Sequence, residues 1–419
     1  MESNTMSKYN KSIAIIGAGP AGVSLANELF KQGYRDISLI DKASDVGGQS
    51  TTLFINGHKS ELATCYLSIG YRSTRQLIKS VGFTIKKLPQ ATLINEQGKK
   101  IPKPKPPLKS IIKYLLKWYV WKRHGQITSP NDAQNALPFN QWLKKNNSNE
   151  LVNDFTFTAG LTAQLYGPVD KITAYNGLQW MTPSLFLSGK FDLTYEIKEG
   201  FQCLWRAIVK KNNIKTILNT EVSKVAGSEK GAQVTVVKDG EVTELAFDTV
   251  VVSTPLNKTH TPLLSLLSGK LNFDYTYAYS AIWKGDNWPS HIESRAYLPA
   301  CMTGEMNKLL SARKDGMIEG KSTGQLAGYV PKNIKKDDVS DIFIKDFENT
   351  LGVTNLEIVE DRLWEYNIRY SPSQILQGVP EKINNAQGEN NIWYTGGALS
   401  HWNVESIINF NKALAKRMA

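Results

Sequence analysis

The sequence is poor in cysteine and has no long apolar run. Its 419 residues include three cysteines, Cys65, Cys203 and Cys301, which are far apart and form no CxxC pair. This spacing disfavours a disulfide framework and a structural zinc site, so no metal is predicted. No apolar stretch reaches the roughly 18 residues that cross a bilayer, and the polar first twelve residues lack the apolar core of a signal peptide. We therefore expect a soluble, cytoplasmic protein.

Histidine is also scarce, and the common catalytic motifs are missing. The five histidines are not clustered, and the sequence has no HExxH, GxSxG, Walker A or kinase motif. The 41% of hydrophobic and 21% of charged residues are typical of globular proteins. The length favours two closely associated domains or one elaborate domain.

Acidic residues are missing from one stretch that carries most of the net charge of +12. Residues 99–123 contain nine lysines and arginines and no aspartate or glutamate. Because the excess is local, we expect no nucleic acid partner, whose footprint usually spreads across a fold. A helix in this stretch carries Lys109, Lys113 and Lys117 on one stripe and is otherwise apolar and aromatic. Two interpretations stay open: the helix packs against the fold, or it makes peripheral contact with a membrane or captures an acidic substrate.

A glycine-rich turn follows the first apolar run. Residues 12–16 predict a buried parallel strand, residues 23–30 an amphipathic helix, and residues 37–41 a second strand that ends in an acid. This order of strand, turn, helix, strand and acid is the dinucleotide-binding fingerprint. The predicted cofactor-binding residues are Gly17, Gly19, Pro20, Ala21 and Gly22 in the turn and Asp41 at the end of the second strand.

The glycines of this turn have separate physical roles. Gly17 permits the tight turn, Gly19 lets the backbone approach a diphosphate, and Gly22 lets the helix pack closely on the strand. The free N–H groups and the dipole of the helix N-terminus favour the phosphates. Asp41 is placed to accept hydrogen bonds from an adenosine ribose, which favours NAD or FAD over NADP.

The residues after Asp41 indicate which of these dinucleotides is bound. Lys42 follows the acid, and Gly47, Gly48 and Gln49 come a few residues later. This pattern resembles flavoproteins of the glutathione-reductase superfamily, in its amine oxidase and phytoene desaturase branch. The resemblance implies that the glycine pair extends the diphosphate-binding surface and that the cofactor is FAD. The branch usually has a basic residue where Gln49 stands.

Later segments share the resemblance. It implies that the backbone of Val222, before a predicted hairpin, meets the adenine, and that Thr254, after a buried strand, lies at the return to the nucleotide domain. The chain ends in a strand, a glycine turn and a helix from about residue 404 to 417. The resemblance places the N-terminus of this helix at the flavin ring, and the residues that it assigns to the cofactor there are Gly396, Gly397, Asn403 and Val404. The branch normally has an acid where Gly397 stands.

Together these segments predict an α/β fold. We expect a Rossmann-type FAD-binding domain, a parallel sheet with helices, interleaved with an α+β substrate domain and a helical lid insertion. The predicted FAD-binding domain is discontinuous and covers residues 1–85, 200–265 and 386–419. The substrate-binding sheet is expected at residues 86–105 and 266–385, and the helical insertion at residues 106–199.

Within the branch, the sequence resembles bacterial FAD-dependent polyenoic fatty acid isomerases, in length, in the glycine motif and in residues 200–202 and 396–405. The resemblance implies hydride transfer to flavin N5 from an apolar, unsaturated substrate such as a fatty-acid-like or polyene molecule. Two differences from the resembled enzymes limit what the resemblance implies. Residues 276–280 lack the lysine that amine oxidases carry near the flavin, and residues 88–92 lack the basic residue that pairs with a carboxylate in the isomerase. Capture of a carboxylate would then fall to Lys86, Lys87 or the 99–123 stretch.

Three aromatic residues are candidates for groups beside the flavin ring: Trp402, next to the closing turn, and Tyr277 and Tyr279, on a predicted strand. Interdomain packing is the alternative role for each. Two other functions stay open. One is a flavin amine or amino-acid oxidase that releases hydrogen peroxide, and the other is a non-catalytic flavin-binding protein at a membrane surface.

Overall fold

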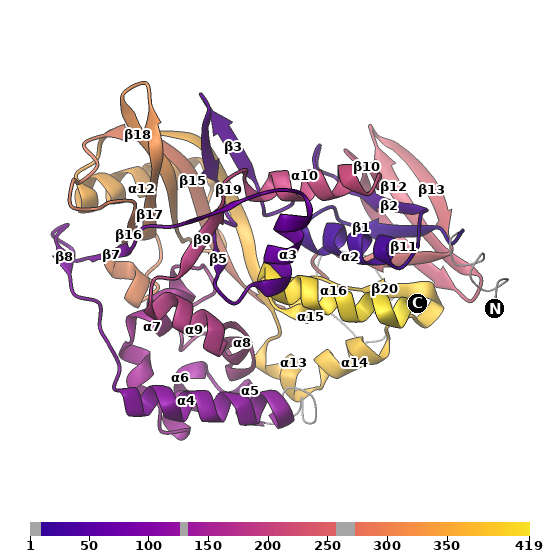
Figure 1. The fold of residues 1–419 in the computed structure, drawn as a ribbon, viewed down its shortest axis with the longest axis horizontal. Coiled ribbons are helices and arrows are strands. Elements are labelled where there is room, and N and C mark those ends of the chain that lie inside the picture. The colour runs from indigo at the N-terminus through magenta and orange to yellow at the C-terminus, as the bar shows by residue number, and fades with distance from the viewer. Residues whose placement is uncertain (1–9, 126–132, 257–272) are drawn as a thin grey trace.

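A computed structural model describes residues 10–125, 133–256 and 273–419 (Figure 1). Residues 1–9, 126–132 and 257–272, which belong to the predicted domain ranges, lie outside the described residues. A parallel sheet with helices lies at one end of the molecule, a largely antiparallel sheet at the other, and a helical lobe beneath them (Figure 1). The predicted α/β fold with a Rossmann-type sheet is confirmed.

The parallel sheet collects short strands from both ends and the middle of the chain. Its order is β10-β2-β1-β14-β20. All residues of β1, β2 and β14 are buried, which fits strands covered on both faces. The bounds are β1 (Ile13–Ile16), β2 (Ile37–Ile40), β10 (Lys215–Ile217), β14 (Thr249–Val252) and β20 (Ile392–Tyr394).

Alternate residues of β1 face different layers. Ile13 and Ile15 pack toward helices, whereas Ala14 and Ile16 join a core on the other face. The helical layer consists of α2 (Pro20–Lys31), α3 (Arg72–Ser80), α10 (Phe201–Lys211) and α16 (Val404–Met418), with α2 in contact with both α10 and α16. The other face is covered by the antiparallel sheet of β11 (Glu221–Ser228), β12 (Gly231–Lys238) and β13 (Glu241–Phe247).

The second large sheet has the order β19-β15-β18-β17-β16-β7-β8. All its neighbours are antiparallel except β16 and β7, which are parallel. The helix α12 (Lys336–Leu351) packs on one face, where Phe343 and Phe347 meet the sheet. The strands are β7 (Ala91–Ile94), β8 (Lys100–Ile101), β15 (Asp274–Asp286), β16 (Arg295–Tyr297), β17 (Leu309–Ile318), β18 (Lys321–Tyr329) and β19 (Thr354–Arg369).

Two small sheets connect the large ones. The hairpin of β3 (Thr52–Ile55) and β4 (His58–Glu61) stands between them, and β9 (Thr194–Ile197) pairs with β5 (Leu67–Ser68) and β6 (Ile85–Lys87). Short helical segments near the sheet ends are η3 (Pro299–Met302), α13 (Pro372–Leu376), α14 (Val379–Asn385), η4 (Glu389–Asn391) and α15 (Gly397–Ser400).

The helical lobe is held together by aromatic packing. The Tyr114 ring lies edge-on against Phe157 and Trp142, and Phe139 stacks on Phe157. Asp154, Thr173 and Thr182 cap three of its helices through side-chain oxygens. The lobe comprises α4 (Leu108–Val120), the π-helical turn η1 (Trp121–Gly125), α5 (Ala133–Ala136), α6 (Phe139–Lys145), η2 (Asn149–Asn153), α7 (Phe155–Thr162), α8 (Ala174–Trp180) and α9 (Pro183–Lys190).

Candidate active site

A cavity of about 1200 Å³ lies over the carboxyl ends of β1 and β14, between α2 and α16. This is the edge of a parallel sheet at which ligands bind in open α/β folds. Eleven of the residues predicted to bind the cofactor are on its wall: Gly17, Gly19, Pro20, Ala21, Asp41, Gly48, Gln49, Thr254, Gly397, Asn403 and Val404. Trp402, predicted as a neighbour of the flavin ring, lines it as well.

The first glycine turn has the geometry that its sequence predicts. Gly17 has a φ of +102°, in the region that favours glycine. A Cβ atom on Gly22 would stand 1.9 Å from the carbonyl oxygen of Gly17, so no side chain fits between this helix and the turn. Gly19 faces Gly48 across the cavity edge, and a Cβ atom on Gly48 would lie 3.1 Å from the Cα atom of Gly19. Two backbones therefore meet at a narrow, side-chain-free wall.

The N-terminus of α2 is free to bind an anion. Gly19 stands at its N-cap position and provides no side-chain cap. The N–H groups of the first helical turn and the positive end of the helix dipole therefore face the cavity without an internal partner. Thr254, across the cavity, has a buried hydroxyl without a hydrogen-bond partner among the described residues. The donors and the absent side chains fit a diphosphate.

Asp41 is held by the backbone of the same turn. One carboxylate oxygen accepts a hydrogen bond from the N–H of Ala18 at 2.6 Å, and the other accepts one from Ala43 at 2.8 Å. The acid thus ties β2 to the glycine turn and still lines the cavity. Its predicted contact with a ribose remains a prediction.

The C-terminal segment closes the cavity from the opposite side. The side chain of Asn403 caps α16 by accepting from the N–H of Ser406 at 2.8 Å. The Trp402 ring packs on Gly397, where a Cβ atom would stand 2.3 Å from the ring. Its indole N–H donates to the carbonyl of Ile368 on β19. An aspartate or glutamate at position 397 would collide with this ring, which gives a physical reason for the glycine.

Several residues predicted for the cofactor lie near the cavity but outside its wall: Gly22, Lys42, Gly47, Val222 and Gly396. Gly22 acts through close packing, as described above, and Gly396 has a φ of +118° at the start of the closing turn. Val222 is half-buried on β11. The predicted contact of Val222 with the adenine is made by its backbone and stays a prediction, as do the roles of Lys42 and Gly47.

Tyr277 and Tyr279 do not reach the cavity, which corrects the placement that the sequence suggested. Both lie on β15 with their rings in the core beneath α12, and Tyr279 stacks on Phe343 with its ring centroid 5.0 Å away. Because side chains alternate along a strand, their neighbour Ala278 faces the other side of the sheet. Burial raises the pKa of Tyr279, and its hydroxyl bonds to Asp361.

The sequence suggests that apolar residues of the insertion, Trp180 and Leu185 among them, could line a pocket, but sequence reasoning missed the rest of the substrate-side wall of the cavity. Tyr66, Gln164, Trp180, Leu185 and Tyr366 come from five separate segments. No local motif marks them, because the fold alone brings these segments together. The other missed lining residues are Ala63, Thr64, Cys65, Tyr71, Ser253, Pro255 and Ile407.

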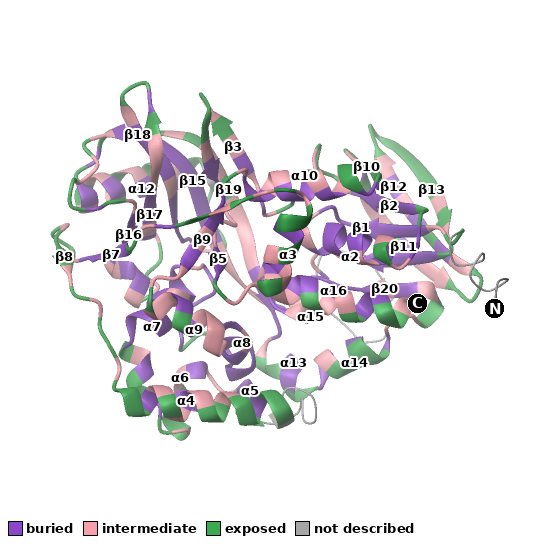
Figure 2. Ribbon diagram, in the orientation of Figure 1, coloured by how far each residue is buried: buried purple, intermediate pink, exposed green. Residues whose placement is uncertain are grey.

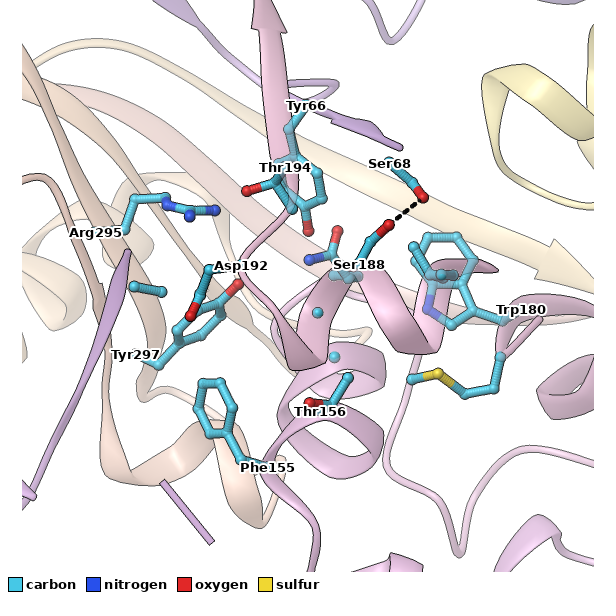
Figure 3. A pocket seen from close by; sticks show the side chains of 16 residues that line it. Tyr66, Ser68, Phe155, Thr156, Trp180, Ser188, Asp192, Thr194, Arg295 and Tyr297 are labelled. Carbon is cyan, nitrogen blue, oxygen red and sulfur yellow. Dashed lines mark hydrogen bonds between the residues drawn. The ribbon is translucent and has the colours of Figure 1, made fainter. Parts of the chain in front are cut away.

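Two further cavities, each of about 620 Å³, adjoin this wall. One lies between the helical lobe and the second sheet and is shown in Figure 3; we call it the inner chamber. Tyr66, Gln164, Trp180 and Leu185 line both the inner chamber and the cofactor cavity. The other, which we call the sheet chamber, shares Tyr66 and Gln164 with both. The three spaces therefore meet around Tyr66 and Gln164.

Burial dominates the electrostatics around these spaces. It raises the pKa of the Cys65 thiol to about 11, so this cysteine is no reactive thiolate. It raises the pKa of Glu61, beneath the sheet chamber, to about 7. His401 follows the closing turn, and burial lowers the pKa of its imidazole to about 3. The Cys65 thiol and the His401 imidazole are therefore neutral at pH 7.

Comparison with known proteins agrees with this geometry. Residues 15–80 match the model of an NAD(P)-binding Rossmann-like domain. A polyenoic fatty acid isomerase from Ptilota filicina is 23% identical over an alignment of 301 residues that covers 61% of this chain and 59% of that protein. The match thus spans less than two thirds of that relative.

Solved structures match over nearly the full length. The crystal structure of a CLA-producing fatty acid isomerase from P. acnes has a TM-score of 0.80 at 17% identity and covers 98% of this chain and 99% of its own. A putrescine oxidase triple mutant has a TM-score of 0.72 at 15% identity, with 97% and 98% covered. This chain has the fold of these fatty acid isomerase and putrescine oxidase structures. The prediction of this fold is confirmed.

Proposed function

We propose that the chain is an FAD-dependent oxidoreductase or isomerase that acts by hydride transfer to flavin N5 from an apolar, unsaturated substrate. One observation carries the proposal: the cofactor cavity and the inner chamber adjoin each other and share Tyr66, Gln164, Trp180 and Leu185 as wall residues. A substrate in the chamber would therefore meet the cofactor without passing through solvent. The similarity to fatty acid isomerases supports the substrate class.

The chain supplies the cradle for the cofactor. The N-terminus of α2 and the facing glycines Gly19 and Gly48 would hold the diphosphate, and Gly397 and the start of α16 would lie at the flavin ring. When bound, FAD supplies a hydride acceptor. The positive end of the α16 dipole is placed to stabilise negative charge at its N-terminus.

The inner chamber would hold the substrate in position and exclude water from it. Phe155, Trp180, Met181 and Leu185 provide most of its apolar wall. A long apolar substrate would be stabilised there by burial, at about 25 cal/mol per Å² of apolar surface removed from water. The wall would also exclude water from the reacting carbon.

Anaerobic stopped-flow measurement of the flavin absorption band tests the proposal. Holoenzyme is mixed with a panel of unsaturated fatty acids and polyenes and, separately, with a panel of amines and amino acids. We expect bleaching by a member of the first panel, followed by an isomerised or desaturated product. Bleaching by an amine, with release of peroxide once oxygen is admitted, would show an amine oxidase instead. Bound FAD that neither panel reduces would contradict the proposal and favour a non-catalytic role.

A further inference from the structure

Arg295 is a buried cation at the end of the inner chamber. It lies on β16, is 7% exposed, and lines both the inner chamber and the sheet chamber. One of its Nη groups donates to the carbonyl of Pro89, and its Nε atom has no partner. No carboxylate lies within ion-pair distance of Arg295 in the part of the chain that the structure describes.

By contrast with Arg295, the charge of the neighbouring arginine is compensated by carboxylates. Arg313 is the direct cross-strand partner of Arg295 on β17. It forms ion pairs with Asp315 and, at 3.3 Å, with Glu196. A buried charge without a counter-charge is strongly destabilising, and like charges directly opposite each other on a sheet add to the penalty. An anion bound at Arg295 would remove both penalties.

The carboxylates around the chamber do not supply that anion. Asp192 lines the inner chamber, but Lys103 pairs with it at 3.1 Å. The Glu61 carboxylate already accepts hydrogen bonds from Thr52 and from the N–H of Phe201 and lies 3.8 Å from the Lys59 ammonium. The local charge of the chamber end is therefore positive.

Neutral donors complete the site. The Arg295 guanidinium extends toward Tyr66 and Thr194 (Figure 3). The hydroxyls of both residues are buried without a hydrogen-bond partner among the described residues. One guanidinium and two hydroxyls match the charge and the acceptors of a single carboxylate.

We propose that Arg295 binds the carboxylate of a long-chain unsaturated acid, with Tyr66 and Thr194 as the supporting donors. The inference rests on the proposed function, because it places the apolar chain along Phe155 and Leu185 toward the cofactor cavity. The anchor is then a residue of the second sheet, not Lys86, Lys87 or the basic 99–123 stretch. A cationic amine would be repelled from this end of the chamber.

Calorimetric titration of the holoenzyme tests the anchor without turnover. The probes are a long-chain dienoic acid and its methyl ester. We expect wild type to bind the acid at least about 10-fold more tightly than the ester, R295Q to bind both alike, and R295K to keep part of the preference. The matched controls K86Q and K87Q change exposed lysines on β6 and should keep the full preference.

The possible outcomes distinguish failure of the proposed carboxylate anchor from failure of the proposed function. Equal binding of acid and ester by wild type, or loss of the preference in K86Q or K87Q but not in R295Q, would overturn the anchor. A preference that depends on Arg295, together with a flavin that no unsaturated acid bleaches, would overturn the proposed function and keep the anchor. R295K guards against misfolding of R295Q, and flavin content and melting temperature report on the fold of both.

An independent observation concerns the outer face of the helical lobe. Leu108, Ile112, Leu116, Tyr119 and Val120 of α4 are exposed, by 49% to 70% of their surfaces. Their spacing of about four residues places them on one face of the helix. Figure 2 shows exposed residues along the outer side of α4.

The opposite face of α4 is anchored to the lobe. The Tyr114 hydroxyl donates to the carbonyl of Met181 at 2.6 Å, and the Trp118 indole N–H donates to the carbonyl of Leu178 at 2.8 Å. The apolar face is therefore exposed although α4 itself is firmly attached to the lobe. Residues 99–123, which include the flanking lysines, carry nine basic and no acidic residues. Among the described residues, Glu150 accepts a hydrogen bond from Ser110 at 2.9 Å and Asp192 pairs with Lys103 at 3.1 Å.

We propose that this face of α4 docks on an anionic lipid bilayer. The apolar stripe would enter the interface and the flanking lysines would pair with lipid phosphates and carboxylates. Among the described residues, no helix is long and apolar enough to cross a membrane. Because α4 packs on the segment that carries Trp180 and Met181, docking would bring the bilayer near the inner chamber.

Cosedimentation with vesicles tests the docking. We expect wild type to pellet with vesicles of phosphatidylcholine and phosphatidylserine, weakly with phosphatidylcholine alone, and less at high salt. I112E/L116E should lose at least about 10-fold in partitioning. The matched control V242E changes an equally exposed valine on β13 and should bind like wild type. Wild type that stays in solution, an equal loss in V242E, or a dimer that buries α4 without vesicles would overturn the proposal.

Discussion

Tyr166 and His401 form a hydrogen bond of 2.9 Å between the phenol oxygen and imidazole Nδ1. Both side chains are buried, and the Trp180 ring packs on each of them. The contact joins the helical lobe to the residue that follows the closing turn of the nucleotide-binding sheet. His401 has a φ of +100°, a conformation that side chains rarely adopt, so the surrounding packing holds this residue in place.

The His401 imidazole makes the fold sensitive to acid. Burial lowers its pKa from the ordinary 6.5 to about 3. Between these values the unfolded chain binds a proton that the folded chain does not, so the free energy of unfolding decreases as the pH falls below 6.5. Relative to H401N, wild type should lose about 1.4 kcal/mol per pH unit in this range. Urea denaturation across this pH range measures the difference. Y166F, which keeps the imidazole, should retain the slope, and equal slopes in wild type and H401N would contradict the prediction.

Glu61 should give the free energy of unfolding the opposite dependence on pH. Burial raises its pKa from the ordinary 4.5 to about 7, against hydrogen bonds from Thr52 at 2.7 Å and the N–H of Phe201 at 3.0 Å. The folded chain binds the extra proton in this range, so stability is lost as the pH rises from 4.5 through 7. Relative to wild type, E61Q should gain up to about 3 kcal/mol above pH 7. The same denaturation series measures this gain, and a gain of equal size at pH 4.5 would point to altered packing instead.

The nucleotide-binding half of the site could be predicted because it depends on local sequence. Gly17, Gly19 and Gly22 follow a strand directly, and a helix must start there, so their contacts are set within a few residues of one another. The closing turn at Gly396 and Gly397 is equally local. Even here, one detail needed the structure: Gly397 is required because the Trp402 ring packs on it.

The substrate half could not be predicted, because it depends on which faces the sheet turns inward. Tyr277 and Tyr279 have the right residue type on the right strand, but the register of β15 directs them under α12. Arg295 lies on a three-residue strand with no distinctive motif. Its importance comes from burial and from the lack of a carboxylate partner, which only the fold determines.

Two glycines of the first turn should respond differently to alanine. In G22A the new Cβ atom would meet the Gly17 carbonyl at 1.9 Å, and a backbone atom cannot move aside, so we expect loss of the fold or a cost of several kcal/mol. In G19A the nearest atom is the Gly48 Cα at 3.7 Å, an ordinary contact, and the φ of −76° suits alanine. The G19A apoprotein should melt like wild type but retain little FAD, because the methyl group occupies the approach to the diphosphate. Thermal unfolding and the ratio of flavin to protein absorbance measure both effects. Full FAD content in G19A would contradict a diphosphate site at this turn.

A bulky residue at the junction should separate cofactor binding from substrate access. Leu185 on α9 lines both the cofactor cavity and the inner chamber, whereas Leu187 on the same helix is 41% exposed. In L185W the indole would fill the space that a substrate needs to reach the cofactor, without touching the glycine turn that holds the diphosphate. We expect unchanged flavin content and flavin bleaching by unsaturated substrate slowed by at least about 10-fold. L187W, which adds the same indole on the outer side of α9, should bleach at the wild-type rate. If L185W bleaches as fast as L187W, substrate reaches the flavin by a route other than the inner chamber.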